Sequence, residues 1–184
     1  KQSHDLNGQS LADPTDASLN YSFHPIAGSV YDSGSSTDYR MVLYNWFGST
    51  YDGQSYYIKN VNIDSYCYNV GLFGTTAGAK IANIVLYSDN GAVIQRNTDP
   101  TPSSGTRTVR QYSTSYALGG LVGIAYDYNS SMGNGSITNC AIAGYTVADN
   151  SRNKQHLGEA AIGGLVGVSS VNLNKCSAVV DLQI

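Results

Sequence analysis

Gly120-Leu121-Val122-Gly123 is one of four glycine-bounded apolar segments that decide how this sequence folds. The other copies are Gly71-Leu72-Phe73-Gly74, Gly164-Leu165-Val166-Gly167 and the worn Asn45-Trp46-Phe47-Gly48. A glycine beside such a short apolar run lets the chain turn tightly, because glycine has no Cβ. The recurrence of this segment indicates a repeat architecture rather than one irregular core.

A second pattern, Ile-x-Asn-apolar-x-apolar, follows each glycine segment. Its copies are residues 58–63, 81–86, 137–142 and 173–178, the last with Lys175 in place of Asn. Their first residues are 23, 56 and 36 residues apart. The shortest interval is about one turn of a parallel β-solenoid, and the longer ones predict insertions on one side of the stack. We place these insertions near 88–116 and 145–160.

The asparagine of the second pattern predicts a corner in the chain. Ile58 and Val61 are three residues apart, so a flat strand would point them to opposite faces. A left-handed bend at Asn60, which Asn tolerates better than other non-glycine residues, would turn both inward. Asn60, Asn83 and Asn139 would then stack as an amide ladder about 4.8 Å apart. The alternative interpretation is that Asn is simply abundant in this sequence.

Composition narrows the class of protein. The chain has 184 residues and 20 Gly, and its charged fraction is 12%, against roughly 25% in an ordinary soluble domain. The net charge of −3 argues against a nucleic-acid partner, which would require a basic surface. The longest apolar runs fall well short of the roughly 20 residues that a membrane-spanning helix needs. These features predict one folded domain that consists mostly of β-strands.

The glycine segments followed by Ile-x-Asn-Cys resemble the GLUG-motif repeats of secreted and surface proteins, including bacterial adhesins. The resemblance covers roughly residues 40–184. It implies a right-handed parallel β-helix (β-solenoid) of about four coils, used as a stalk or binding surface without chemistry of its own. We therefore expect a GLUG-type solenoid over 41–184. Residues 1–40 would form an N-terminal cap, since an open solenoid end exposes unpaired strand edges.

A search for catalytic and metal-binding patterns assigns no role to any residue. The three His lack the spacing of metal ligands, and no Ser stands in a recognisable arrangement with a base and a carboxylate. Parallel β-helices include polysaccharide-cleaving enzymes, so that class remains a weaker alternative. Such an enzyme needs clustered carboxylates, whereas the acidic residues here are scattered. The sequence predicts a protein that is not an enzyme and has no metal, cofactor or catalytic residue.

The first insertion is the candidate contact surface. It carries three cationic residues followed by two aromatic ones: Arg96, Arg107, Arg110, Tyr112 and Tyr116. Tyrosine offers wide, stiff contact area with a hydroxyl group, which suits a glycan or a protein surface. The plain alternative is a solvated loop. We predict an adhesion or structural module, secreted or on the cell surface, that presents its loops to a glycan or a surface protein.

The last residues suggest a second class of function. Residues 179–184 have a strand-like pattern with no proline that would block pairing with another chain. Head-to-tail pairing between copies would produce a surface filament rather than a closed ring. A self-assembling filament subunit is therefore the alternative to an adhesion module.

The cysteines predict burial rather than bridging. Cys140 and Cys176 occupy the same position in two copies of the second pattern, so they are expected on neighbouring strands. Inward-facing pairs of this kind are strained as disulfides, and we expect packed thiols. Cys67 has no partner in this alignment.

Overall fold

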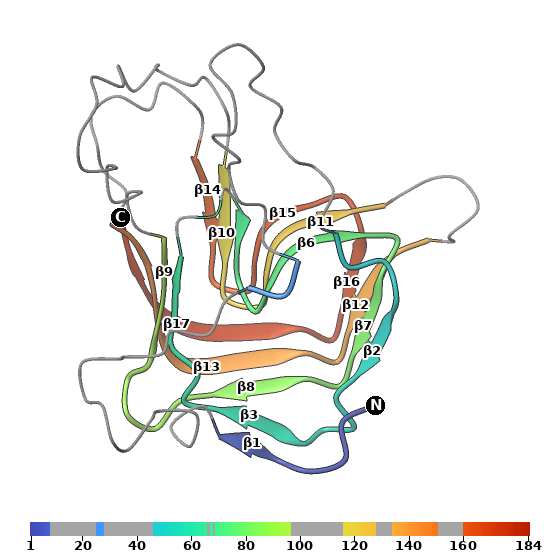
Figure 1. Ribbon diagram of the computed structural model, residues 1–184, viewed down its shortest axis with the longest axis horizontal. Coiled ribbons are helices and arrows are strands. Elements are labelled where there is room, and N and C mark those ends of the chain that lie inside the picture. Colours follow the sequence, from blue (N-terminus) through green and yellow to red (C-terminus); the bar gives the residue numbers. More distant parts are fainter. Residues whose placement is uncertain are drawn as a thin grey trace, which may run out of the picture.

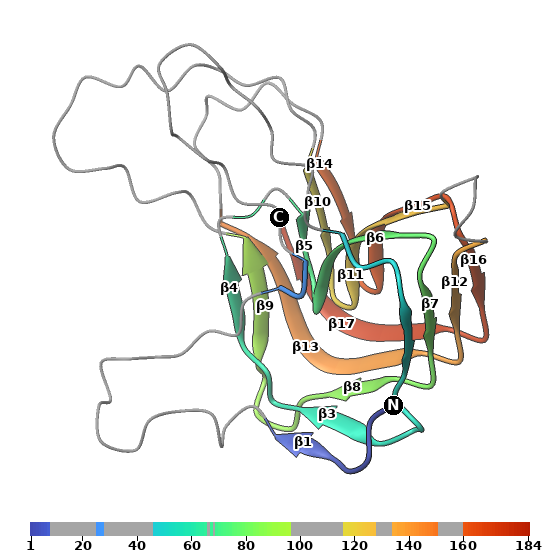
Figure 2. The same ribbon diagram turned by 45° about the vertical axis from the view of Figure 1, so that its right-hand side comes forward.

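A computed structural model shows an all-β protein. It describes residues 1–7, 25–27, 46–65, 67, 69–96, 116–127, 134–150 and 160–184. Over these ranges the chain contains no helix, and its paired strands run parallel. Figures 1 and 2 show the strands lined up edge to edge and curled around a common interior. No helix in the described ranges has the length and apolarity to cross a membrane.

Three of the four sheets are short. The four-stranded sheet contains β2 (Thr50–Asp52), β7 (Lys80–Ala82), β12 (Ser136–Thr138) and β16 (Asn172–Asn174). One three-stranded sheet contains β5 (Asn69–Val70), β10 (Tyr116–Gly119) and β14 (Ala160–Gly163). The other contains β6 (Phe73–Ala77), β11 (Val122–Tyr126) and β15 (Val166–Ser169).

The seven-stranded sheet bends along its length. Its shorter strands are β1 (Leu6–Asn7), β3 (Tyr57–Lys59), β4 (Ile63–Ser65), β8 (Val85–Tyr87) and β9 (Val93–Arg96). Its long strands are β13 (Ala141–Asp149) and β17 (Ser177–Gln183). β13 pairs with β8 through its first half and with β9 through its second half. The bend lies at Gly144, where φ is +76° and the β13–β17 register shifts.

The three Gly-Leu-Val-Gly-type segments align as the sequence predicted. Val122 pairs with Phe73 on one side and with Val166 on the other. The backbones approach closely here: a Cβ at Gly120 would lie 2.5 Å from the carbonyl oxygen of Gly164. A side chain at this position would therefore push the neighbouring strands apart, which explains the glycine.

The prediction that residues 45–48 are a degenerate fourth copy of the glycine segment is wrong. Phe47 pairs with Thr76, and the place beside Phe73 belongs to Ile26. Trp46 is 44% exposed, so it does not supply the buried apolar side chain that Leu72 supplies. Phe47 instead packs its ring against Phe73, with the two ring centroids 5.1 Å apart. An aromatic pair followed by glycine is thus not sufficient to mark a repeat.

The predicted amide ladder is confirmed at Asn83 and Asn139. Their φ angles are +56° and +54°, and Lys175 continues the series at +53°. Asn139 Nδ2 donates to Asn83 Oδ1 (2.8 Å), and Asn83 Nδ2 donates to Asp52 Oδ1 (2.9 Å). These side-chain bonds join the ends of β2, β7 and β12 along one corner.

Asn60 is left-handed as predicted (φ +53°) but lies at a different corner. Ile58 pairs with Leu86, and the strand residue beside Ile81 is Tyr51, 30 residues earlier. Asn60 Oδ1 accepts a hydrogen bond from Ser88 Oγ (3.2 Å) instead of joining the ladder. Two successive corners of the chain both need a bend between inward-facing apolar residues, so they share the same local sequence pattern. The 23 residues between Ile58 and Ile81 therefore separate two different corners and do not measure one repeat.

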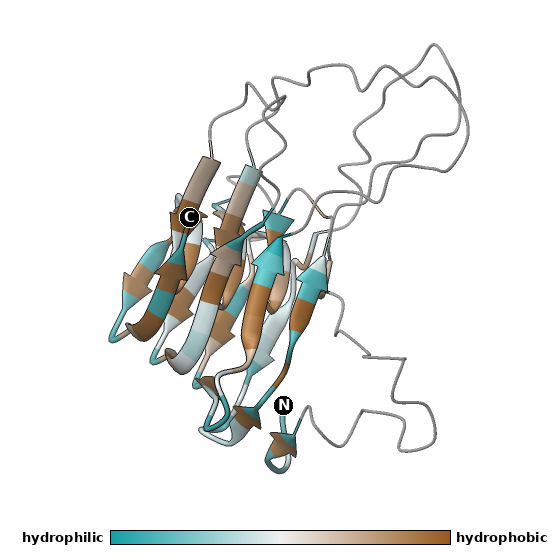
Figure 3. Ribbon diagram, turned by 90° about the vertical axis from the view of Figure 1, so that its left-hand side faces the viewer, coloured by the Kyte–Doolittle hydropathy of each residue, from teal (hydrophilic) through white to brown (hydrophobic). Residues whose placement is uncertain are grey.

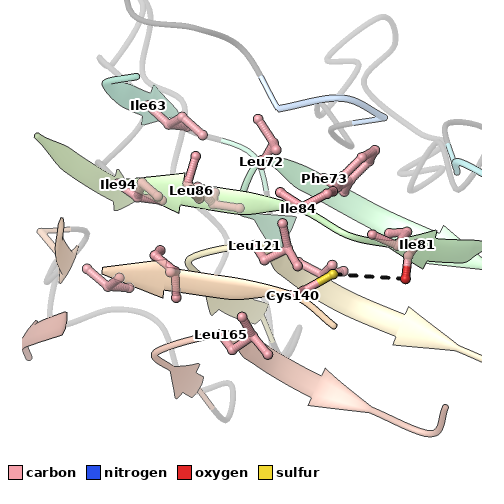
Figure 4. Packing of buried hydrophobic residues seen from close by; sticks show 14 of the residues in the cluster. Ile63, Leu72, Phe73, Ile81, Ile84, Leu86, Ile94, Leu121, Cys140 and Leu165 are labelled. Carbon is pink, nitrogen blue, oxygen red and sulfur yellow. Dashed lines mark hydrogen bonds between the residues drawn. The ribbon is translucent and has the colours of Figure 1, made fainter. Parts of the chain in front are cut away.

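The core lies between the sheets. Figure 4 shows apolar side chains from successive strands packed together, and Figure 3 shows hydrophobic segments recurring from one strand to the next. Leu121 is fully buried, and Leu165, in the last copy, is 9% exposed. Burial of these side chains is the main force that stabilises the stack.

Parts of both predicted insertions belong to strands. Residues 93–96 form β9, whose Ile94 is fully buried, and residues 145–149 continue β13. Segments 97–115 and 151–159 lie outside the described residues.

The N-terminal residues 1–7 lie against the first strands. Leu6 pairs with Ile58, and Gln2 N donates to the carbonyl oxygen of Asp52 (3.0 Å). Most of residues 1–40 lie outside the described ranges, so a cap over that whole range stays a prediction.

Candidate functional site

Two long chain connections leave the sheets at the same corner. Segment 97–115 follows β9 and leads into β10, and segment 151–159 follows β13 and leads into β14. β9 and β13 are paired neighbours, as are β10 and β14 (Figure 1). Both inserted segments therefore start from adjacent strand ends and return into adjacent strand starts. The residues that flank the two segments lie on neighbouring strands, and the placement of the insertions themselves stays a prediction.

A buried cluster of polar residues lies where the first segment leaves and re-enters the sheets. Arg96 is the last residue of β9 and Tyr116 the first of β10, and the Arg96 guanidinium carbon lies 4.1 Å from the centroid of the Tyr116 ring. Arg96 Nε donates to the carbonyl oxygen of Cys67 (3.0 Å). The Tyr116 hydroxyl donates to the carboxylate of Asp149, the last residue of β13.

The cluster joins both ends of the first inserted segment to the start of the second. Arg96, Tyr116 and Asp149 are 4%, 9% and 7% exposed. Charged groups so far from water are tolerated only where opposite charges and hydrogen bonds satisfy them. Asp149 is the register partner of Arg96 on the adjacent strand, and the stacked cation and ring add a further attraction. The arrangement holds the strand ends at fixed positions.

The five predicted contact residues therefore divide into two groups. Arg96 and Tyr116 are buried and support the base of the first segment. Arg107, Arg110 and Tyr112 lie outside the described residues, so their contact with a partner stays a prediction. Asp149 is one of the scattered acidic residues to which sequence reasoning gave no role. Its position inside the predicted second insertion, near 145–160, is the sequence signal that could have marked it.

A row of amide and carboxylate side chains lies beside the cluster. Gln95 Nε2 donates to Asp64 Oδ2 (3.0 Å), and Asn150 Nδ2 donates to Gln95 Oε1 (2.7 Å). A cavity of about 380 Å³ lined by Asp149, Asn150, Gln183 and Ile184 opens nearby. The amide side chains here both donate and accept hydrogen bonds and the carboxylates accept them, as sugar hydroxyls require.

The cysteines are free thiols, as the sequence predicted. Cys67 and Cys140 are buried, and Cys176 is half-buried. Burial raises the pKa of the Cys140 thiol to about 11, and burial likewise raises the pKa of Tyr145 to about 12. The Tyr145 hydroxyl accepts a hydrogen bond from Val61 N (3.1 Å). These groups belong to the packed interior.

Over the described ranges, no three His, Cys, Asp or Glu side chains gather in a way that would hold a metal ion. Comparison with models of protein families, with curated proteins and with solved structures finds no match. The functional argument therefore depends on the geometry of this chain.

Proposed function

We propose that this chain is a right-handed parallel β-helix of about four coils that acts as a non-catalytic adhesion module, secreted or on the cell surface. The observation that supports this function is the common corner. Neighbouring strands hold both ends of segments 97–115 and 151–159, and a buried Arg96–Tyr116–Asp149 cluster fixes both ends of the first segment and the start of the second. A rigid scaffold that presents two adjacent segments is suited to binding a glycan or a surface protein.

The resemblance to GLUG-motif repeats supports the same proposal. The three well-formed glycine segments lie in register, and every described pairing is parallel, as in stacked coils. The inserted segment 97–115 carries Arg107, Arg110 and Tyr112, which offer donors and aromatic surface.

The two other classes receive less support. A polysaccharide-cleaving enzyme would use accessible carboxylates on one face, whereas Asp64 and Asp149 at this corner are hydrogen-bonded to Gln95 and Tyr116. A head-to-tail filament needs two complementary ends, and β1, the outermost strand beside β3, is only 2 residues long and offers little edge for pairing.

Binding to a glycan array and to intact cell surfaces tests the proposal. The chain is compared with the triple variant Arg107→Ala, Arg110→Ala, Tyr112→Ala, and with Tyr57→Ala as a matched control. Tyr57 is 42% exposed on β3, away from the strand ends that flank the inserted segments (Figure 1). The triple variant should lose at least about tenfold in affinity with its melting temperature unchanged, and the control should bind normally. A wild-type chain that binds neither surface, or a triple variant that binds equally well, would refute the proposal.

A further inference from the structure

The corner between β8 and β9 is held firmly at both ends and open at its tip. Ser88 N donates to the carbonyl oxygen of Ala143 (2.9 Å), and Thr146 N donates to the carbonyl oxygen of Ala92 (3.1 Å). Ala92 N donates to Ser88 Oγ (2.8 Å), which closes the corner. Ser88 and Ala92 are buried, whereas residues 89–91 between them are exposed.

The exposed tip contains Asn90-Gly91, one of the two Asn-Gly pairs that lie wholly within the described residues. The main-chain nitrogen after an Asn can attack the side-chain amide carbon, and glycine hinders this attack least because it has no Cβ. A Cβ at Gly91 would meet no atom within 4 Å, and no acceptor among the described residues takes a hydrogen bond from Gly91 N. Ser88 Oγ donates to Asn90 Oδ1 (2.8 Å), which makes the amide carbon more electrophilic and would stabilise the oxyanion that forms on attack.

We propose that Asn90 is a site of spontaneous deamidation, which converts it into aspartate and isoaspartate in the folded chain. Gly91 N forms a bond with Asn90 Cγ and gives its proton to a base in solvent. The bond from Cγ to Nδ2 breaks, and the nitrogen takes up a proton and leaves as ammonia. Water then adds to either carbonyl carbon of the resulting succinimide ring and opens it, with no oxidant or cofactor. This inference does not depend on the proposed adhesive function.

The second Asn-Gly pair, Asn134-Gly135, is an internal comparison. Asn134 is also exposed, but Gly135 is buried, and a Cβ there would lie 2.8 Å from Val171 Cγ1. Gly135 N donates to Asp127 Oδ1 (3.0 Å). Because this bond to a carboxylate must break before the nitrogen can attack, Asn134 should react about tenfold or more slowly than Asn90.

The reaction changes the charge and the main chain at the tip of the corner. Each product adds one negative charge beside Asp89, in a chain whose net charge is −3. Isoaspartate also adds a carbon atom to the main chain. Since Ser88 and Ala92 hold the corner on both sides, the exposed tip takes up the added atom, and β8 and β9 keep their register. We therefore expect the deamidated chain to melt at the same temperature as the intact one.

Peptide mapping by mass spectrometry tests the proposal, with chromatography to separate isoaspartate from aspartate. The full chain is incubated in mildly alkaline buffer, either folded or unfolded in urea. In the folded chain Asn90 should convert about tenfold or more faster than Asn134. In urea the two should convert at similar rates, because each is followed by glycine and neither is held by the fold.

Gly91→Asn is the matched variant. Asn tolerates the left-handed backbone of this position, where φ is +71°, and its side chain has open space, so circular dichroism should show a normally folded chain. The new side chain hinders the main-chain nitrogen, and conversion of Asn90 should slow several-fold.

Three results would overturn the proposal. An Asn90 that stays intact in the folded chain but converts in urea means that the corner protects it. Equal rates at Asn90 and Asn134 in the folded chain, or an undiminished rate in Gly91→Asn, mean that access to the glycine nitrogen does not control the reaction. Aspartate formed without isoaspartate means direct hydrolysis and excludes the ring.

Discussion

Replacing Lys175 by Asn should stabilise the protein, because Lys175 occupies a position whose backbone suits Asn. Its φ is +53°, close to the values at Asn83 and Asn139 on the preceding strands of the same corner. The left-handed backbone conformation costs a non-glycine residue roughly 1–2 kcal/mol. The cost is smaller for Asn, because its short polar side chain can form a local hydrogen bond. The long side chain of Lys175 lacks the short polar group that makes the left-handed backbone less costly for Asn.

The amide ladder adds to the expected gain. Asn139 donates to Asn83, which donates to Asp52, so an Asn at position 175 can donate to Asn139 in the same direction. An exposed amide–amide hydrogen bond contributes about 0.5 kcal/mol, at the low end of the usual range. With part of the backbone cost recovered, we expect Lys175→Asn to raise the free energy of unfolding by about 1 kcal/mol. For a chain of this size the melting temperature should rise by roughly 2–4 °C.

Urea denaturation followed by circular dichroism measures the effect, at a concentration where sedimentation shows a single species. Lys175→Gln is the matched control, because it removes the charge but has a longer side chain without the left-handed preference of Asn. It should leave stability unchanged. If Lys175→Asn is no more stable than the wild type, or if Lys175→Gln gains as much, the stacked-corner reasoning is wrong.

Three further predictions concern the core. Leu121→Asp places a carboxylate at a fully buried position, so circular dichroism at about 25 °C should show an unfolded chain. Leu173 is 45% exposed, and the control variant Leu173→Asp should remain folded. A folded Leu121→Asp chain would contradict the assignment of Leu121 to the core. Cys176 should react first with a thiol reagent at pH 8 and Cys140 much later, because burial raises the pKa of the Cys140 thiol to about 11; equal rates would contradict its burial. Burial raises the pKa of Tyr145 to about 12 in the folded chain, whereas an exposed Tyr in the unfolded chain has a pKa of about 10. Between these two pH values the unfolded chain loses the Tyr145 proton and the folded chain keeps it. Stability should therefore be complete below pH 10 and fall by about 1.4 kcal/mol per unit up to pH 12, and urea denaturation of Tyr145→Phe should lack this part of the fall.

Local sequence predicted the features of the fold that local sterics require. The glycine of Gly120-Leu121 marks a place where two backbones nearly touch, and only glycine fits there. Asn83 and Asn139 mark a bend whose left-handed backbone few other residues accept. Such positions can be read without knowing which strands pair, because the constraint lies within a few residues.

The register between repeats could not be read in the same way. Ile58-Lys59-Asn60-Val61 and Ile81-Ala82-Asn83-Ile84 obey one local rule at two different corners, so their similarity does not make them equivalent. The buried cluster at the candidate site could not be predicted for the same reason. Arg96 and Asp149 are 53 residues apart and become neighbours only through the β9–β13 pairing. Long-range pairing, rather than residue type, brings them together.

The amide ladder ends at Lys175 because of the chemistry of its side chain. Within the series Asp52, Asn83, Asn139 and Lys175, the two middle residues both donate and accept, whereas a carboxylate only accepts and an ammonium group only donates. An Asn at position 175 would both donate and accept, so it would leave an amide available to a further residue of the series, which an ammonium group cannot do. The donor and acceptor chemistry of the side chain at each left-handed corner therefore decides where the ladder ends.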